Sequence, residues 1–393
     1  MSRIRQLVIF LGMFTIILAA SHFYMFERIS YYLQLTPNNR RLTAFLLVLL
    51  PGLIVVSIPL KRILPKSAES VLTWIIYPWM GIALFMFITL AATDILWLVV
   101  QILAINQPPD LLLQYYLGIA ALGVTVLLCG FALWKGLASV TVKDVSVGLN
   151  NLPSSFDGFR IVQITDLHIG PMIDGKWLKK VVDKVNALNP DLIVITGDLV
   201  DGTVADLCHQ IAPLGDLFSR HGCYFVTGNH EYYSGVEAWC RHLLQLGIKV
   251  LRNERVSISS GINDESFDLA GVDDWGSRHF PGGGPDLPKA LAGRDPAKKL
   301  VLLAHQPAAI HEAVLNGVDL QLSGHTHAGQ IWPFTYLVPL QQPYSKGLHL
   351  HQDTHTQIYI SSGTGFWGPP MRLGTSAEIT HITLRTTSNG ESR

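Results

Sequence analysis

The sequence LIVITGDL, residues 192–199, sets a glycine and an aspartate directly behind an apolar, β-branched run. Residues 192–196 show no alternation of polar and apolar side chains, which predicts a short strand buried on both faces. Open α/β sheets bind their ligands at the carboxyl ends of their strands. The stretch therefore predicts a buried sheet with Asp198 at its ligand-binding edge.

Four more predicted strands end in the same way. Each is followed by aspartate, asparagine or histidine: Asp166-Leu167-His168 after 159–165, Gly228-Asn229-His230-Glu231 after 224–227, His305 after 300–304, and Gly324-His325-Thr326-His327 after 320–323. Segments 176–188, 236–246 and 308–315 show the helical spacing of apolar residues. Residues 148–393 are thus predicted to form a layered α/β domain.

Residues 1–147 hold four long apolar runs, at 7–26, 42–60, 71–93 and 111–134. A helix of about 20 residues crosses a hydrocarbon core of about 30 Å. We therefore expect four transmembrane helices ahead of the α/β domain, in a multi-pass protein of the cell membrane. Asp94 follows the third run, and it lies either at the membrane interface or beside a partner among the helices.

The distribution of charged residues predicts which side of the membrane the α/β domain faces and whether it binds nucleic acid. If four helices cross, seven basic residues share the side of the α/β domain and three lie opposite, which favours a cytoplasmic domain over an external one. The two sets are Arg3, Arg5, Lys61, Arg62, Lys66, Lys135 and Lys143 against Arg28, Arg40 and Arg41. Residues 148–393 hold 19 basic and 24 acidic side chains, so we expect no nucleic acid partner.

The candidate ligands suit a pair of metal ions. Carboxylate, amide and imidazole groups are all present, and the four cysteines show no CxxC spacing. Two ions about 3.5–4 Å apart lower the pKa of a bridging water and clamp the phosphoryl oxygens. We therefore expect two divalent transition metal ions in a phosphoesterase, with manganese expected and iron or zinc as alternatives.

These five blocks resemble those of the calcineurin-like metallophosphoesterase superfamily over about residues 155–385. The resemblance implies two packed mixed β-sheets flanked by helices. It implies that one metal is held by Asp166, His168 and His327, the other by Asn229, His305 and His325, and both by a bridging Asp198. His230 matches the family histidine that contacts the phosphate and is proposed to protonate the leaving group, and Asn229 would orient it.

A narrower resemblance comes from GHTHAGQI, residues 324–331, and from Gly363-Thr364-Gly365 with Pro370-Met371-Arg372. These are similar to a membrane-associated bacterial branch that contains YkuE-like phosphoesterases and transmembrane proteins with a metallophosphoesterase domain. Some relatives of that branch cleave UDP-2,3-diacylglucosamine in lipid A synthesis. The resemblance implies the lipid bilayer as a partner and a phosphate-ester or lipid-linked substrate.

Two further features, Arg372 and the loop 332–340, each allow two interpretations. Arg372 either binds a substrate phosphate or forms a surface salt bridge. The apolar loop 332–340, which follows the last histidines directly, either reaches lipid or packs on its own domain.

The leading hypothesis is a membrane-anchored hydrolase of phosphodiester or pyrophosphate bonds that uses a metal-bridging hydroxide. A nuclease-type phosphodiesterase is one alternative, because DNA repair nucleases share the five blocks. A non-catalytic membrane scaffold that keeps its metals for folding is another. The presence of His230 argues against the scaffold, since folding needs the ligands but not that histidine. The sequence carries no signal for the oligomeric state.

Overall fold

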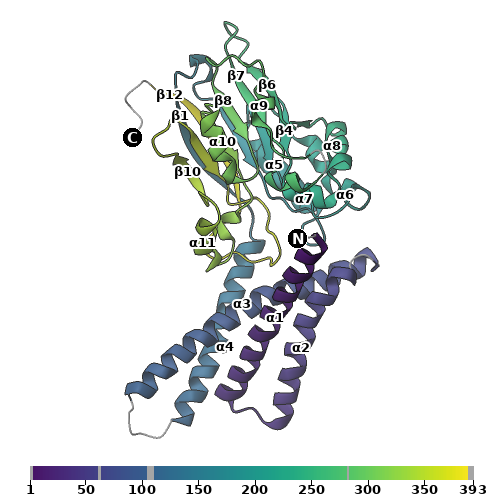
Figure 1. The fold of residues 1–393 in the computed structure, drawn as a ribbon, viewed down its shortest axis with the longest axis vertical. Helices are drawn as coiled ribbons and strands as arrows, with labels where there is room; N and C mark the ends of the chain where they lie inside the picture. Colours follow the sequence, from purple (N-terminus) through teal and green to yellow (C-terminus); the bar gives the residue numbers. More distant parts are fainter. Residues whose placement is uncertain (1–2, 61–62, 104–109, 281–282, 388–393) are drawn as a thin grey trace. The chain divides into compact units, whose positions relative to one another are not determined.

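The computed structural model describes residues 3–60, 63–103, 110–280 and 283–387, which form two compact units (Figure 1). The helical unit comprises Met1–Trp134 with Gly368–Met371. The sheet unit comprises Lys135–Trp367 with Arg372–Arg393. An N-terminal helical part and an α/β part, as predicted, are therefore both present.

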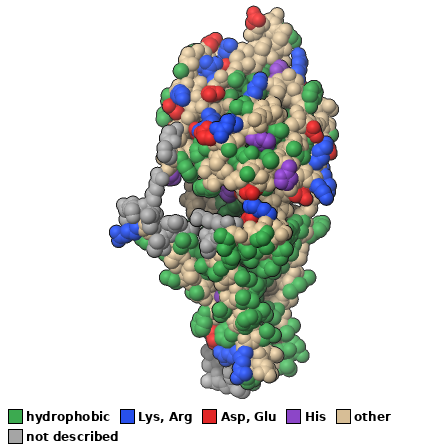
Figure 2. All heavy atoms as spheres, turned by 90° about the vertical axis from the view of Figure 1, so that its right-hand side faces the viewer, with side chains coloured by type: hydrophobic (Ala, Val, Ile, Leu, Met, Phe, Trp, Pro, Cys, Tyr) green, Lys and Arg blue, Asp and Glu red, His purple; other side chains and the backbone are tan. Residues whose placement is uncertain are grey.

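The helical unit contains α1 (Arg3–Leu33), α2 (Pro37–Leu60), α3 (Lys66–Leu103) and α4 (Leu111–Leu137). Hydrophobic side chains cover most of its visible surface, as expected for helices that face lipid (Figure 2). Within the described residues, three stretches are long and apolar enough to cross a membrane: Pro37–Ser57, Lys66–Leu103 and Leu111–Leu137.

Three of the four expected spans are thus found among the described residues, and α1 is not one of them. The second half of α1 carries His22, Glu27 and Arg28, which lower its apolar character. The side chains at positions 7, 8 and 10 of the expected span 7–26 are not described, and Lys61 and Arg62 of the orientation count lie outside the described residues.

Asp94 of α3 has partners on α1. Its carboxylate accepts hydrogen bonds from the hydroxyls of Tyr24 (2.6 Å) and Tyr32 (2.8 Å). Arg28 forms an ion pair with it through Nε at 2.9 Å. Asp94 is therefore a partnered carboxylate that joins the first and third helices, and its position at the membrane interface stays a prediction.

The sheet unit is built on two mixed six-stranded sheets, in the orders β1-β12-β2-β3-β4-β5 and β10-β11-β9-β8-β7-β6. The strands of the first are β1 (Thr141–Asn150), β2 (Arg160–Ile164), β3 (Leu192–Thr196), β4 (Cys223–Val226), β5 (Lys249–Val250) and β12 (Glu378–Thr387). Those of the second are β6 (Glu254–Ser259), β7 (Ser266–Gly271), β8 (Leu300–Leu303), β9 (Leu320–Ser323), β10 (Gly347–Leu350) and β11 (Gln357–Ile360).

The two sheets pack face to face between layers of helices. On β3, Leu192 and Val194 share a core with Val301 and Leu303 of β8 in the other sheet. Alternate residues of β3 belong instead to a core with the helices α5 (Gly175–Ala187), α6 (Val204–Ile211) and α8 (Val236–Gln245). The helices α9 (Leu287–Ala290) and α10 (Ile310–Leu315) cover the second sheet. The strand is buried on both faces, and the predicted sandwich is confirmed.

Candidate metal centre

The candidate ligands follow parallel strands of both sheets. Within each sheet, β2, β3 and β4 run parallel, as do β8 and β9, so their carboxyl ends share an edge. Backbone hydrogen bonds continue past the strand ends, from Asp166 N to Gly197 O (3.0 Å) and from Gly324 N to His305 O (2.9 Å). The loops that carry the ligands are therefore held in register.

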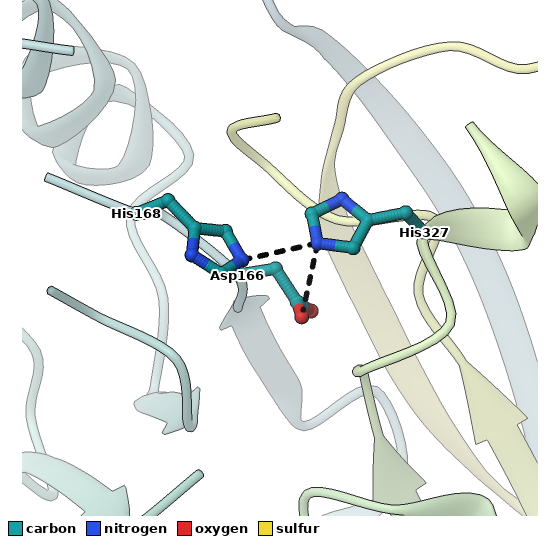
Figure 3. Close-up of side chains that lie close together, drawn as sticks. All are labelled: Asp166, His168 and His327. Atoms are coloured by element: carbon teal, nitrogen blue, oxygen red, sulfur yellow. Dashed lines mark hydrogen bonds and ion pairs between the residues drawn. The ribbon is translucent and has the colours of Figure 1, made fainter. Parts of the chain in front are cut away.

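The first cluster consists of Asp166, His168 and His327, whose potential ligand atoms all lie within 4.8 Å of one another. The three side chains point toward one another, with Nε2 of His168 and Nε2 of His327 3.1 Å apart (Figure 3). Nε2 of His327 lies 3.4 Å from Oδ1 of Asp166. Two nitrogens bound at about 2.0–2.1 Å to one ion would lie about 3.0–3.4 Å apart. The spacing therefore fits a shared ion.

The second cluster consists of Asp198, His305 and His325. Nε2 of His305 lies 3.2 Å from Nδ1 of His325 and 3.2 Å from Oδ2 of Asp198. Oδ1 of Asn229, at the start of α7 (Asn229–Ser234), is buried and has no hydrogen-bond partner among the described residues. Buried polar atoms normally have partners, so this oxygen fits a metal ligand.

Asp198 connects the two clusters. Its Oδ2 lies 3.9 Å from Nε2 of His168 in the first cluster and 3.2 Å from Nε2 of His305 in the second. Its Oδ1 accepts a hydrogen bond from the backbone N–H of His230 at 2.9 Å. This carboxylate stands where a bridge between two ions would be needed.

Asp201 is a site residue that sequence reasoning missed. Its Oδ1 lies 3.1 Å from Nδ1 of His168 and 2.6 Å from Nδ1 of His230. A histidine that donates from Nδ1 offers the lone pair of Nε2 to a metal, so this contact orients His168 as a ligand. A second acidic residue three positions after Asp198, in the same loop, was the available signal.

Nδ1 of His305 lies 2.7 Å from the carbonyl oxygen of Thr196, and donation to that carbonyl leaves Nε2 free as a ligand. Behind the ligands, buried Glu231 accepts hydrogen bonds from the backbone N–H groups of Asp198 (3.0 Å), Leu199 (2.8 Å) and Gly228 (2.7 Å). It ties the loop after β3 to the loop after β4.

Five of the candidate ligands have left-handed backbones, with positive φ at Asp166, His168, Asp198, His325 and His327. Each such residue costs of order 1–3 kcal/mol and persists only where the surroundings enforce it. Gly197 has φ +88°, and a Cβ there would lie 2.6 Å from Nδ1 of His305. The concentration of strained positions at one edge is typical of a functional site.

The carboxylates and histidines of the centre strongly shift one another's pKa values. Burial opposes ionisation of Asp198, but His305, His230 and His168 outweigh it and hold the pKa of this carboxyl well below its usual range. Burial, and then the charge on His305, lower the pKa of His325 to about 3. Without metal, protons on some histidines balance the carboxylates, and a divalent ion would compete with those protons.

His230 lies beside the clusters, with Nε2 3.9 Å from Oδ2 of Asp198. Burial lowers its pKa, but the hydrogen bond to Asp201 and the charge of Asp198 outweigh burial and raise the pKa to about 9. The rings of Tyr233 and Trp367 flank it, with centroids at 5.6 and 6.0 Å.

Arg372 is fully buried, and it belongs to neither ligand cluster. Its guanidinium donates hydrogen bonds to the carbonyl oxygens of Ser362 (2.9 Å), Gly363 (3.3 Å) and Gly365 (2.6 Å). In this structure it supports the loop after β11, and the binding of a substrate phosphate by Arg372 stays a prediction.

A profile of the calcineurin-like phosphoesterase family matches residues 159–329. The chain is 40% identical over 273 residues to a transmembrane protein with metallophosphoesterase domain from Danio rerio, covering 68% of this chain and 62% of the relative. It is 40% identical over 267 residues to an uncharacterized metallophosphoesterase from Helicobacter pylori, covering 67% of this chain and 70% of that protein. It is 32% identical over 266 residues to the uncharacterized metallophosphoesterase YkuE of Bacillus subtilis, covering 66% of this chain and 90% of that protein.

The chain belongs to the calcineurin-like metallophosphoesterases, a family of metal-dependent phosphoesterases. The aligned part spans about 62% of the length of the transmembrane relatives from Danio rerio and Bos taurus. Three helices able to span a membrane and relatives named as transmembrane proteins mark it as a membrane protein.

Proposed function

We propose that the chain is a membrane-anchored two-metal phosphoesterase that hydrolyses phosphodiester or pyrophosphate bonds. One observation carries the proposal: the Asp198 carboxylate stands between two histidine clusters whose nitrogens have the spacing of ligands on common ions. Bound there, two divalent ions would supply a hydroxide nucleophile and neutralise charge on the phosphoryl oxygens.

In this proposal the ligands are those that the family resemblance implies. Asp166, His168 and His327 hold one ion, and Asn229, His305 and His325 hold the other, with Asp198 shared. Oxygen and imidazole donors without thiolates suit manganese, with iron and zinc as the competing choices.

His230 is proposed to protonate the leaving group. Its Nδ1 is held by Asp201, so the imidazolium carries its other proton on Nε2, toward the Asp198 side of the centre. In the metal-free chain, a pKa raised to about 9 keeps that proton in place at neutral pH. Asn229 precedes His230 in α7 and would fix its position while binding metal.

We propose a substrate that resides in or on the membrane, because the sheet unit is covalently attached to membrane-spanning helices. UDP-2,3-diacylglucosamine, whose pyrophosphate is lipid-linked, is the substrate to test first.

The test uses the full chain in detergent micelles, stripped with chelator and reloaded with manganese. Bis(p-nitrophenyl) phosphate, UDP-2,3-diacylglucosamine and duplex DNA are the three probes. We expect hydrolysis of the first two, loss of activity in chelator and none on DNA. Cleavage of DNA alone would favour the nuclease. A chain that binds metal but cleaves no probe would favour the scaffold.

A matched pair of variants tests the acid. His230→Ala should keep two metals and lose roughly 10²–10⁴-fold in kcat, whereas His209→Ala, on α6 and outside the clusters, should leave both unchanged. Unchanged turnover in His230→Ala would remove His230 from the mechanism.

A further inference from the structure

Exposed apolar side chains gather on the segment that follows the last metal-ligand histidine. Tyr336 is 72% exposed and Leu340 is 79% exposed, on the short helices α11 (Phe334–Leu337) and η6 (Val338–Leu340). We call the exposed set the apolar rim: Trp332, Phe334, Tyr336, Leu337, Leu340 and Trp367. An exposed apolar cluster of this kind marks an interaction surface.

The apolar rim is attached to the metal centre. The side-chain amide of Gln330, three residues after His327, donates to the carbonyl of Trp367 and accepts from its N–H, both at 3.0 Å. The Trp367 ring lies 6.0 Å from that of His230, between centroids. Figure 1 shows α7, which carries His230, and α11 at the same end of the sheet unit. A partner bound at the rim would therefore lie beside the proposed acid.

The composition of residues 325–352 indicates that the partner is a lipid surface. Residues 325–352 contain no aspartate or glutamate, and their one lysine is Lys346. Tryptophan and tyrosine are the residues enriched where proteins meet the lipid headgroups. A segment without negative charge also meets no repulsion from anionic lipids.

Chain connectivity keeps the first strand of the sheet unit close to a membrane-spanning helix. Helix α4, a membrane span, ends at Leu137, and β1 begins at Thr141. Four chain steps cover at most about 14 Å when fully extended. The sheet unit thus begins within that distance of the end of a membrane helix.

We propose that the apolar rim inserts into the headgroup region of the bilayer and brings the metal centre close to the phosphates of membrane lipids. This goes beyond the proposed function, because insertion is measurable whether or not the chain hydrolyses any phosphate ester.

The experiment places an environment-sensitive fluorophore on single cysteines, introduced into the full chain after its four native cysteines are replaced by alanine. The labelled protein is reconstituted in vesicles of phosphatidylcholine and phosphatidylglycerol. Tyr336→Cys and Leu340→Cys report on the apolar rim. Leu315→Cys, 85% exposed at the end of α10, is the matched control on the same unit. We expect blue-shifted emission, and quenching by lipids brominated in the acyl chain, for the two rim labels only. Rim labels as exposed to water as the Leu315 label would overturn the proposal.

A charge-insertion variant links insertion to substrate access. Tyr336→Glu combined with Leu340→Glu should abolish lipid quenching of a label placed at Leu337→Cys. The rate on soluble bis(p-nitrophenyl) phosphate should stay within roughly twofold, because neither residue belongs to the metal centre. Quenching that persists in this variant would also overturn the proposal. A chain that inserts but hydrolyses neither soluble nor lipid substrate would refute the proposed function alone.

Discussion

Asp201 is the residue on which the two roles of the centre converge. One carboxylate oxygen faces Nδ1 of the ligand His168 and Nδ1 of the proposed acid His230. Burial opposes its charge, but the His168 imidazolium outweighs burial and holds the pKa of Asp201 far below its usual range. It therefore stays an anion that orients both rings.

Asp201→Asn should reduce kcat roughly 10- to 100-fold with little loss of metal, because a neutral amide oxygen can still accept from both rings but no longer stabilises the charge of the His230 imidazolium. Metal content by mass spectrometry and steady-state kinetics measure the two effects. Asp183→Asn, an exposed acid on α5, is the control. Unchanged kcat would show that Asp201 does not position His230.

For single residues, the sequence predicts which chemical groups form the site better than it predicts where each side chain lies. The seven proposed ligands and the proposed acid His230 occur in recognisable motifs, and the structure brings them to one edge. Asp201 is one of 20 aspartates in the chain, and only its three-dimensional place marks it. Arg372 could not be assigned to the interior because its burial depends on the carbonyl oxygens of a loop that no local pattern predicts.

At the scale of elements, the turns that follow the strands hold the site. Gly197 combines a left-handed backbone with a close approach, since an added Cβ would meet Nδ1 of His305 at 2.6 Å and Gly228 N at 2.7 Å. Gly222 has the same left-handed backbone, with φ +91°, but more space around it. A Cβ added there would lie 3.9 Å from the nearest atom, on the ring of Tyr224.

Gly197→Ala should therefore lower metal occupancy and the melting temperature, whereas Gly222→Ala should show only the backbone effect, of about 1 kcal/mol. Differential scanning calorimetry and metal analysis on both variants separate strain from displacement of His305. Equal effects in the two variants would contradict the close-approach argument.

The Asp94 cluster gives a second prediction for elements. Polar contacts between membrane helices contribute about 0.6 kcal/mol each on average, so Asp94→Ala should lower the free energy of unfolding of the helical unit by about 2 kcal/mol. Denaturation in mixed micelles measures it. A double-mutant cycle with Arg28→Ala isolates the ion pair. Additive losses would show that Arg28 and Asp94 do not stabilise each other.

Elements with a continuous apolar run were predictable, as β3 shows: 192–196 was expected and Leu192–Thr196 is observed. The edge strand β1 was not, because five of its first six residues are exposed and its pairing with β12 depends on a segment more than 230 residues away. Edge strands lack the buried pattern by which strands are recognised.

At the scale of the whole molecule, the number of spans decides which side the sheet unit faces. With four spans, seven basic residues favour a cytoplasmic sheet unit. With α1 outside the membrane core, the two sides carry five each: Arg3, Arg5, Arg28, Arg40 and Arg41 against Lys61, Arg62, Lys66, Lys135 and Lys143. Charge then gives no preference.

We propose a cytoplasmic sheet unit, and fusions at both termini test it. A green fluorescent protein at the C-terminus should fluoresce, and an alkaline phosphatase there should be inactive. An N-terminal fusion on the same side would mean that α1 crosses, and one on the opposite side that it does not. An active C-terminal phosphatase would place the sheet unit outside.

Metal and pH act on the whole fold through the charges of the centre. In the metal-free chain the pKa of His230 is raised to about 9, above its unfolded value of about 6.5. The folded state then binds more protons, so the stabilisation is complete below pH 6.5 and is lost as pH rises through about 9. The difference corresponds to about 3 kcal/mol.

Metal reverses this dependence, because its histidine ligands must be neutral and binding therefore strengthens as pH rises. The melting temperature of the chelated chain should fall between pH 6.5 and 9, and that of the manganese-loaded chain should hold or rise. Calorimetry of the full chain in micelles, with and without chelator, measures both curves. His230→Ala should make the chelated curve less steep, although His168 and His305, whose pKa values are also raised, still contribute to it. A chelated chain that gains stability over this interval would show that His230 is not held protonated by Asp198 and Asp201.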